Sequence, residues 1–221
     1  MIDVTLIDSM GSDLTVVNAA RVSFNKKSEW DEDNTLTVSD SILISYLARH
    51  KHMSPFGHCF ASFHVKAPIF VARQLVKHKF LRWNEVSRRY VDDKPDWYWP
   101  KDDVWRGRAK DKKQGSEGLI DLKEDEELLG DVVETTEWCR ALYSKLLDKG
   151  VAPEQARMVL PQSTMTEWYW SGSLDAFSDM CTLRLKEDTQ YETRVVAKDI
   201  SSKMKELYPV SWFYLMGKED E

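Results

Sequence analysis

The sequence has 221 residues, of which 42% are hydrophobic and 31% are charged, and its formal net charge is -6. This composition is typical of one globular domain, and the acidic balance disfavours a general nucleic-acid binder, which usually carries a basic excess. No apolar run approaches the roughly 18 residues of a membrane span. The start MIDVTLIDSM lacks the features of a signal peptide, so a cytoplasmic location is expected.

The first part of the chain shows strand and helix patterns in turn. Within residues 1–7, Ile2, Val4 and Leu6 alternate with Asp3 and Thr5, with the period of two that a half-buried strand shows. Ser12 is a suitable N-cap for a short helix over residues 13–24, and apolar spacing predicts a second helix over residues 39–52. Residues 58–65 alternate again. Because both faces of this strand are largely apolar, it is predicted to be central in its sheet.

The pair Ala67 and Pro68 predicts the start of another helix, because proline is tolerated in the first helical turn. This helix is expected to continue to Lys79. Spacing places one set of residues on a face that can pack and another set on an exposed face. The first set is Ile69, Ala72 and Val76, and the second is Phe70, Arg73, Gln74 and Lys77.

The second half of the chain is mainly helical in pattern. Residues 92–127 are an exception, because 20 of these 36 residues are charged with mixed sign, which indicates a mobile surface insertion. Helices are predicted over residues 131–150 and, more briefly, 152–161. Two further helical patterns cover residues 173–186 and 189–207. The chain is therefore expected to be rich in helix with only a few strands.

Several common chemistries find little support in the residues. Cys59, Cys139 and Cys181 are far apart and fit no metal pattern, so buried free thiols are expected. Cys59 has His58 beside it, but strand alternation points these two side chains to opposite faces, which disfavours a cysteine nucleophile. No metal site is expected, and GxGxxG and GxxxxGK[ST] motifs are absent. The tryptophans of DWYWPKDDVW and EWYW could stack on a ring, although most such aromatics fill cores.

One stretch is unusually basic for an acidic protein. Six of the 31 Lys and Arg residues lie within residues 73–89, with only Glu85 opposing them. The simplest interpretation is a solvated helix face followed by a cationic loop. Alternatively, Ser87 with Arg88 and Arg89 offers a hydroxyl, backbone NH groups and two guanidinium groups to a single phosphate. Any anionic ligand would then be small and locally bound.

The basic stretch resembles a family signature. KHKFLRWNEVSRRY is similar to the motif of the flavin-dependent thymidylate synthases, in which Arg-His-Arg, seven residues and a serine follow one another. Lys77, His78 and Lys79 stand at the first three positions, and Ser87 stands at the last. Four further blocks resemble the family in family order, so the resemblance covers most of the chain outside residues 92–130. These blocks are LTVVNAARVSF, YLARHKHMSPFGHCFASFHVKAPIFVARQ, GVAPEQARMVLP and LRLKEDTQYE.

The resemblance implies an α+β fold in which helices pack on a small, mostly antiparallel sheet. It implies a single domain over residues 1–221 with a charged surface insertion at about 92–127. The implied reaction is the reductive methylation of dUMP to dTMP, with methylenetetrahydrofolate as carbon donor and NADPH reducing a bound FAD. The resemblance also implies a homotetramer with active sites at subunit interfaces, and neither nucleic acid nor membrane is expected as a partner.

The resemblance also assigns site residues. Arg184 matches the arginine that faces the uracil, and it is the expected catalytic residue because a fixed cation would stabilise negative charge on the polarised ring. The implied dUMP-binding residues are Gln74, Leu75, Val76, Lys77, Glu85, Val86, Ser87, Arg88, Arg89, Arg157 and Arg184. The implied FAD-binding residues are His52, Ser54, Lys77, His78, Lys79, Glu85, Ser173, Asp175 and Asp179.

The sequence departs from the family pattern at a few of these positions. Lys77 and Lys79 replace arginines, and because lysine lacks the planar guanidinium fork, they are expected to hold flavin or phosphate less tightly. Arg88 replaces a glycine, and it would be strained if that position required a positive φ. Two other functions are therefore kept: a divergent homologue that transfers a hydroxymethyl group, and a non-catalytic nucleotide-binding protein.

Overall fold

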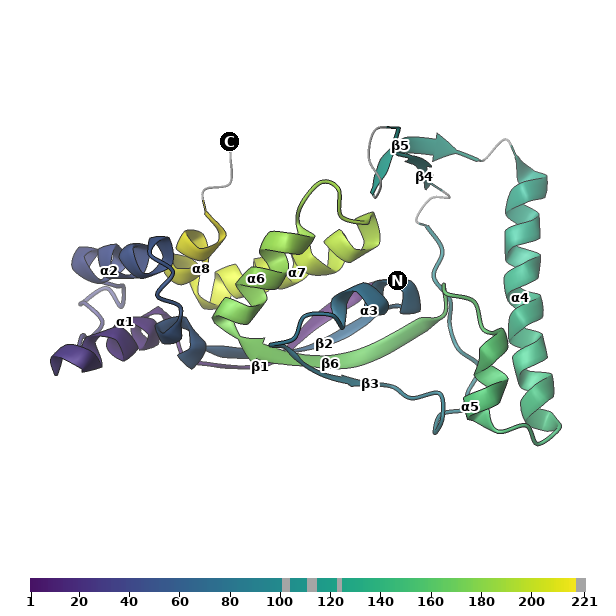
Figure 1. Ribbon diagram of the computed structural model, residues 1–221, viewed down its shortest axis with the longest axis horizontal. Helices are drawn as coiled ribbons and strands as arrows, with labels where there is room; N and C mark the ends of the chain where they lie inside the picture. Colours follow the sequence, from purple (N-terminus) through teal and green to yellow (C-terminus); the bar gives the residue numbers. More distant parts are fainter. Residues whose placement is uncertain (101–103, 111–114, 123–124, 218–221) are drawn as a thin grey trace.

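The protein is built on a four-stranded antiparallel sheet, and helices cover one of its faces (Figure 1). The computed structural model describes residues 1–100, 104–110, 115–122 and 125–217. The strands are β1 (Asp3–Met10), β2 (Phe60–Pro68), β3 (Arg82–Glu85), β4 (Val104–Arg108), β5 (Ser116–Asp121) and β6 (Met165–Ser173). The α-helices are α1 (Asp13–Arg21), α2 (Val38–Arg49), α3 (Ile69–Leu75), α4 (Glu126–Asp148), α5 (Pro153–Ala156), α6 (Leu174–Arg184), α7 (Tyr191–Leu207) and α8 (Pro209–Met216). Short 3₁₀ helices are η1 (Val22–Phe24), η2 (Ser54–His58) and η4 (Arg157–Val159). The expected α+β class is confirmed.

The strand predicted to be central is central. The order of the main sheet is β1-β2-β6-β3, so β2 pairs with β1 on one side and with β6 on the other, antiparallel to both. On one face of β2, Ala61, Phe63 and Val65 are buried in the core. This burial follows from the alternation seen in the sequence, because successive strand residues point to opposite faces.

The neighbouring strand β6 was not expected. Its buried residues alternate with accessible ones: Trp168 and Trp170 lie in the core, whereas Tyr169 between them is exposed. Trp168 stacks on Trp83 of β3, with ring centroids 4.4 Å apart. These two tryptophans of EWYW therefore fill the core, as most aromatics do, and the residues around them have the period of a strand.

The helix α3 is shorter than predicted, and its packed face is different. It ends at Leu75, so the prediction that it continues through Lys77 to Lys79 is wrong. Val71, Ala72 and Leu75 are buried, whereas Val76 is 46% exposed. The reason is topological: β3 pairs antiparallel with β6, and the chain turns back toward this strand over residues 76–81.

The family resemblance implies a phosphate loop over residues 85–89, but in the structure this loop begins one residue later. Glu85 is the last residue of β3 and pairs with Trp168, so it belongs to a strand and not to the loop. The amide of Val86 still donates to the main-chain oxygen of Glu167 at 2.9 Å. The irregular segment therefore starts from a fixed point at the edge of the sheet.

The charged segment over residues 92–127 has a defined fold in its described part. β4 and β5 form an antiparallel hairpin, and Trp97 forms a bridge with Thr164 just before β6. Residues 101–103, 111–114 and 123–124 of this segment lie outside the described residues. Whether the segment is mobile stays a prediction, but it contains two strands that the sequence did not indicate.

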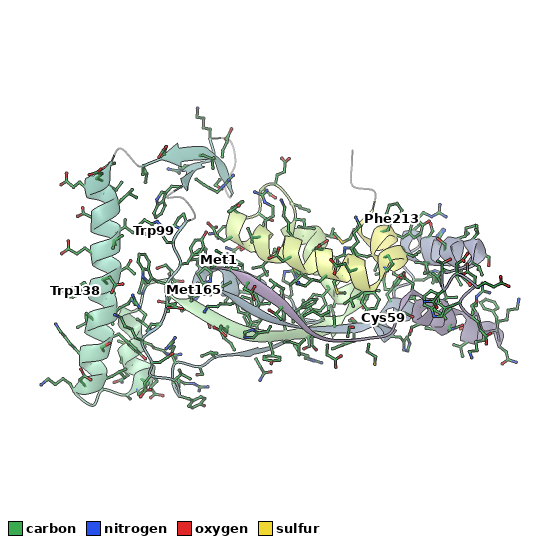
Figure 2. The ribbon with its side chains drawn as sticks, turned by 180° about the vertical axis from the view of Figure 1, so that it is seen from behind. Met1, Cys59, Trp99, Trp138, Met165 and Phe213 are labelled. Carbon is green, nitrogen blue, oxygen red and sulfur yellow. The ribbon has the colours of Figure 1, made fainter. Side chains whose placement is uncertain are left out.

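The molecule is elongated, and its ends are formed by different elements. The helix α4 stands at one end beside α5, whereas α1 and α2 lie at the other (Figure 1). Figure 2 shows the same separation through Trp138 on α4 and Cys59 near α1. Among the described residues, no helix is long and apolar enough to cross a membrane.

Candidate functional site

Arg184 is held by two groups at the end of α3. It is the last residue of α6, and its Nε atom donates to Nε2 of His78 over 3.1 Å. Its Nη2 atom donates to the main-chain oxygen of Gln74 over 2.8 Å. The chain thus brings together the expected catalytic arginine, one expected dUMP-binding residue and one expected FAD-binding residue. Nη1 of Arg184 donates to no described residue, so it is free to bind a ligand.

His78 is neutral in this arrangement. Burial, with the adjacent Arg184 cation as a second cause, lowers the pKa of His78 from 6.5 to about 4. A neutral ring can accept the hydrogen bond from Arg184 at Nε2 while it carries its proton on Nδ1. His78 therefore acts as an acceptor that orients the guanidinium group, and protonation would remove this contact.

We expect His78 to make the stability of the protein depend on pH between about 6.5 and 4. In this range the unfolded chain binds a proton that the folded chain excludes, so the free energy of unfolding falls as the pH falls. With the folded pKa at about 4 and the unfolded value at 6.5, the fall between pH 7 and pH 5 is about 2 kcal/mol. Urea unfolding at both pH values measures it. His78→Gln keeps a hydrogen-bond acceptor but does not titrate in this range. If the free energy of unfolding falls equally in this variant, His78 is not the cause of the pH dependence.

The side chain of Gln74 is fixed from α7. Its Nε2 atom donates to Oε1 of Gln190, and its Oε1 atom accepts from the hydroxyl of Thr193 over 3.2 Å. Sequence reasoning did not identify either partner as a site residue. Gln190 lies within the family block LRLKEDTQYE, which is the only signal that pointed to it.

A pocket of about 520 Å³ collects a second group of expected dUMP-binding residues. From the expected set it contains Val76, Glu85, Val86, Arg88 and Arg157. The structure adds residues that the sequence did not indicate, among them Arg73, Gln162 and Thr166. Three guanidinium groups at one pocket can bind a phosphate group, whose oxygens match the guanidinium fork. Gln74, Lys77 and Arg184 do not line this pocket.

The carboxylate of Glu85 is fixed at the wall of this pocket. Its Oε2 atom accepts from Nε1 of Trp83 over 3.1 Å, and its Oε1 atom accepts from the hydroxyl of Thr166 over 2.8 Å. Because both oxygens are occupied by neighbours from β3 and β6, the carboxylate presents a defined acceptor to a ligand. This role differs from that of a mobile loop residue.

In the turn after β3 the backbone is unstrained at Arg88, and both arginines of the turn already contact neighbouring groups. Arg88 forms an ion pair with Asp93 and also donates to its main-chain oxygen over 2.9 Å. Arg89 donates from Nε to the hydroxyl of Ser87 over 3.1 Å. Arg88 has no positive φ, so the strain considered for an arginine at a glycine position does not arise. A phosphate would have to share Arg88 with Asp93.

Leu75 occupies a different environment from the other expected residues. Its side chain is fully buried in the core. Any contact of Leu75 with a nucleotide would therefore come from its main chain. Lys77 and Lys79 next to it are exposed and form no ion pair with any described residue. Both ammonium groups are thus available to an anionic ligand.

The remaining FAD-binding candidates gather at the first turn of α6. Ser173 is the N-cap of α6, and Asp175 follows in the first turn. Gly57 of η2 lies beside Asp175, because a Cβ atom added to this glycine would be 4.0 Å from Oδ1 of Asp175. Burial, with Asp175 as a second cause, raises the pKa of Asp179. Ser54 begins η2, and His52 just before it contacts the ring of Tyr46 with centroids 5.8 Å apart.

One buried atom of this group lacks a partner. Oδ1 of Asp175 is buried and accepts no hydrogen bond from any described residue. A buried acceptor without a partner is costly, and a ligand hydroxyl or NH group would satisfy it. The residues therefore fit a dinucleotide cofactor, because Asp175 could accept from its hydroxyl groups and Lys77 and Lys79 could bind its phosphate groups. Asp175 and Arg184 are about 14 Å apart along α6, so only an extended ligand reaches both ends.

Two of the three cysteines, Cys59 and Cys181, are poorly suited to act as nucleophiles. Burial, followed by the nearby Asp13 carboxylate, raises the pKa of Cys59 to about 12. Burial also raises the pKa of Cys181, which is fully buried. Because the thiolate is the nucleophilic form, neither group is reactive near neutral pH. This agrees with the expectation that the chemistry needs no cysteine.

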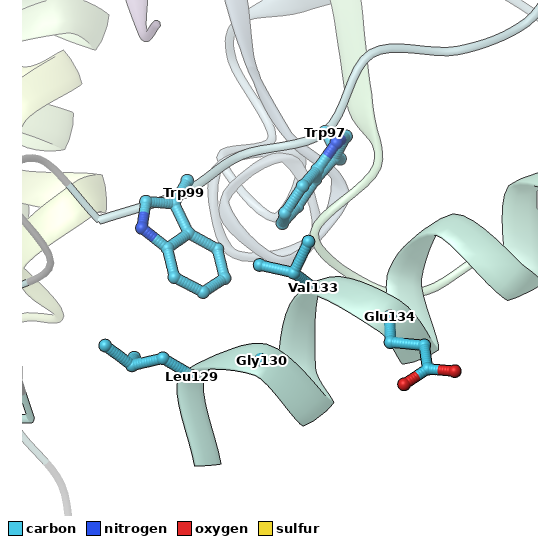
Figure 3. Close-up of a pocket in the computed structure, with 6 residues that line it drawn as sticks. All are labelled: Trp97, Trp99, Leu129, Gly130, Val133 and Glu134. Atoms are coloured by element: carbon cyan, nitrogen blue, oxygen red, sulfur yellow. The ribbon is translucent and has the colours of Figure 1, made fainter. Parts of the chain in front are cut away.

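A second pocket lies in a different part of the molecule. It has a volume of about 590 Å³ and lies between α4 and the segment that precedes β4 (Figure 3). Trp97 and Trp99 face Leu129 and Val133 of α4 across it. None of the expected site residues lines this pocket, and its wall is mainly apolar.

Comparison with known proteins gives a consistent result. Residues 5–210 match the family model described as "Thymidylate synthase complementing protein". A flavin-dependent thymidylate synthase of Thermus thermophilus is 43% identical over 210 residues, which are 95% of this chain and 73% of that protein. One of Thermosipho melanesiensis is 38% identical over 204 residues, 92% of this chain and 86% of that protein.

A solved structure is also similar to this chain. It is described as the UMP/dUMP methylase PolB from Streptomyces cacaoi bound with 5-Br dUMP. Its TM-score is 0.83 and its sequence identity 33%, and the match covers 96% of this chain and 93% of that chain. The same methylase was also solved with 5-Br UMP.

Proposed function

The chain belongs to the family of flavin-dependent thymidylate synthases, and on this premise we propose that it is a methyltransferase that converts dUMP into dTMP. One observation of the structure carries the proposal furthest. The arginine that the family resemblance assigns to the uracil is fixed by His78 and Gln74 and keeps its Nη1 group free. A guanidinium group that is oriented before the substrate binds can stabilise charge as that charge develops.

Arg184 is the residue to which we assign the catalytic role. Its Nε atom donates to His78 and one Nη2 hydrogen to Gln74, so its remaining N–H groups would be available to a carbonyl oxygen of the uracil. Partial burial lowers the pKa of Arg184, but an arginine stays protonated at neutral pH. The cation thus stabilises negative charge on the ring without transferring a proton.

The flavin is proposed to bind through two groups of residues. His78 with Lys77 and Lys79 would hold it near Arg184, and Glu85 would contact it from the wall of the arginine pocket. Ser173, Asp175 and Asp179 with His52 and Ser54 would hold it at the start of α6. FAD supplies the hydride of the reaction when it is bound. The orphaned Oδ1 of Asp175 and the two exposed ammonium groups support this assignment.

The arginine pocket is proposed to hold the phosphate of dUMP. Arg157 donates from Nε to the main-chain oxygen of Glu154 over 3.2 Å, and its two Nη groups donate to no described residue. We expect Arg157→Ala to weaken dUMP binding by a factor of about 10 to 30, because it removes a charge-assisted contact that is partly exposed to solvent. Calorimetry should show no change for deoxyuridine, which lacks the phosphate.

The control for this prediction is Lys149→Ala. It removes one positive charge just after α4, and Lys149 does not line the pocket. We expect its dUMP affinity to equal that of the wild type. A similar loss in both variants would mean that net charge alone, and not the pocket, attracts the nucleotide.

The product decides between the proposed reaction and its alternatives. The purified protein loaded with FAD should oxidise NADPH only when both dUMP and methylenetetrahydrofolate are present. Mass spectrometry of the nucleotide should then show an added methyl group. An added hydroxymethyl group would identify a divergent transferase, and a protein that binds dUMP without binding flavin would identify a non-catalytic binding protein.

A second substrate is supported by the solved relative. The similar structure is that of a UMP/dUMP methylase, and it was also solved with 5-Br UMP. We therefore propose UMP as the substrate to compare with dUMP in the same assay. A higher kcat/KM for UMP than for dUMP would show that UMP is the preferred substrate.

We further propose a homotetramer in the cytoplasm, with folate and NADPH as partners, as the family resemblance implies. The two groups of expected dUMP-binding residues support an assembly with shared sites. Gln74 and Arg184 lie outside the pocket that contains Glu85, Arg88 and Arg157. Two chains could each contribute one group to the same nucleotide. Light scattering on the purified protein tests the oligomeric state.

A further inference from the structure

Gln190 stands at the start of α7, but its side chain does not serve that helix. It occupies the N-cap position and makes no capping hydrogen bond. N-cap positions usually hold Ser, Thr, Asp or Asn, whose short side chains accept from the amides of the first turn. Instead, Oε1 of Gln190 accepts a hydrogen bond from Nε2 of Gln74 at the end of α3. The longer side chain connects two helices.

Thr193 completes this contact from the first turn of α7. Its side-chain hydroxyl donates to Oε1 of Gln74 over 3.2 Å, and Thr193 itself is fully buried. Both heteroatoms of the Gln74 carboxamide therefore have a partner, which fixes the position and the plane of this group. Its second N–H and its second lone pair stay available for a ligand.

The same residue is connected to Arg184 through its main chain. The carbonyl oxygen of Gln74 accepts from Nη2 of Arg184 over 2.8 Å. Gln74 is therefore held by α7 through its side chain and by α6 through its main chain. Loss of the contact with Gln190 would free the Gln74 amide, which is an expected nucleotide contact, and would loosen the anchor of Arg184.

The hairpin of β4 and β5 packs on both sides of Gln190. The guanidinium group of Arg106 lies 5.3 Å from the ring centroid of Tyr191, and its Nε atom donates to the hydroxyl of Ser116 over 2.6 Å. A Cβ atom added to Gly115 would lie 2.8 Å from the main-chain oxygen of Asp188. The hairpin thus contacts the chain two residues before Gln190 and one residue after it.

We propose that Gln190 is a positioning residue that orients the Gln74 amide for the nucleotide, and that the β4–β5 hairpin holds Gln190 in place through Arg106. This inference rests on the proposed function, because it takes Gln74 as a nucleotide contact. It assigns a role to the charged segment, which braces the start of α7. Neither Gln190 nor Arg106 touches the substrate in this scheme.

The first test separates positioning from stability. Gln190→Ser removes the contact with Gln74 but places a favourable N-cap residue on α7. We expect an unfolding midpoint equal to or above that of the wild type, and a Kd for dUMP that is about 5 to 10 times higher, in line with the loss of one hydrogen bond. Gln190→Glu keeps an acceptor for Gln74 and should bind dUMP within about twofold of the wild type.

The second test asks whether the hairpin acts through Gln190. Arg106→Ala should raise the Kd for dUMP by about two- to fivefold, because it removes a partly exposed cation–π contact. Arg108→Ala removes the same charge from the same strand at an exposed position and should leave the Kd unchanged. In the double variant of Arg106→Ala with Gln190→Ser, the two losses of dUMP-binding free energy should not add. Both substitutions act on the same contact, the one between Gln190 and Gln74.

Each outcome supports or overturns a defined statement. If the wild type binds dUMP and forms dTMP while Gln190→Ser binds dUMP equally well, the inference is overturned and the proposed function stands. Full additivity in the double variant overturns the role of the hairpin. If the wild type neither binds dUMP nor forms dTMP, the proposed function fails and the inference fails with it.

Discussion

Replacing Arg184 by alanine should lower kcat for dTMP formation by a factor of about 10² to 10³ while the protein stays folded. The reason is that Arg184 is oriented before substrate binds, by His78 at 3.1 Å and by the main-chain oxygen of Gln74 at 2.8 Å. An alanine leaves no donor where charge develops on the ring, and water is a poor replacement because it must reorganise. Product formation by the FAD-loaded enzyme, followed by chromatography, measures the effect.

Two variants make this result specific. Arg184→Lys keeps the charge but cannot donate to His78, Gln74 and the substrate with the geometry of a guanidinium group, so kcat should fall to an intermediate value. Arg108→Ala, on the exposed face of β4, should turn over like the wild type. Flavin absorbance and thermal unfolding show whether the variants retain cofactor and fold. An unchanged kcat in Arg184→Ala would show that Arg184 is not the catalytic residue.

The elements that could be predicted from the sequence are those with a strong local signal. The alternation in β1 and β2 and the long apolar spacing of α4 and α7 identified these elements, and Ser12 caps α1 as expected. The strands β3 and β6 were missed, because they depend on pairing with residues far away in the chain. Trp168 and Trp170 take their strand conformation from β2, and no neighbour in sequence reveals that partner.

The candidate site, like the fold, could be predicted from the sequence only in part. Family spacing placed Arg184, His78 and Gln74 in the expected ligand sets, but it did not show that these three residues touch one another. Arg184 lies 106 residues after His78 and 110 residues after Gln74 in the chain, so no local pattern could reveal these contacts. The end of α3 at Leu75 was also missed, because the return to β3 stops the helix and local propensity does not.

The helix α8 is anchored by a residue that lies almost 200 positions earlier in the chain. Oδ2 and Oδ1 of Asp13 accept hydrogen bonds from the amides of Val210 and Ser211 over 2.9 and 2.8 Å. Asp13 is 3% exposed, so its carboxylate serves as a buried cap for the first turn of α8. A negative charge at this end also interacts favourably with the helix dipole.

Asp13→Ala should therefore lower the free energy of unfolding by about 3 kcal/mol, since two buried amides lose charge-assisted hydrogen bonds. For a chain of this size the thermal midpoint should fall by about 6 to 12 °C. Asp13→Asn retains one side-chain oxygen as an acceptor and should cost about half as much. Urea and thermal unfolding measure both variants.

The matched control is Asp8→Ala on the exposed part of β1. Among the described residues, Oδ1 of Asp8 accepts only from the amide of the adjacent Ser9, over 2.8 Å at an exposed position. The cost should therefore stay near or below about 0.5 kcal/mol. A loss in Asp13→Ala no larger than this would show that α8 is held by its other contacts and does not depend on Asp13. Tyr208 gives those contacts a second polar anchor, because its hydroxyl lies 2.9 Å from the main-chain oxygens of Met10 and Phe60. Asp13→Ala should therefore loosen the start of α8 without releasing it, so hydrogen exchange should rise at Val210 and Ser211 more than at Tyr208.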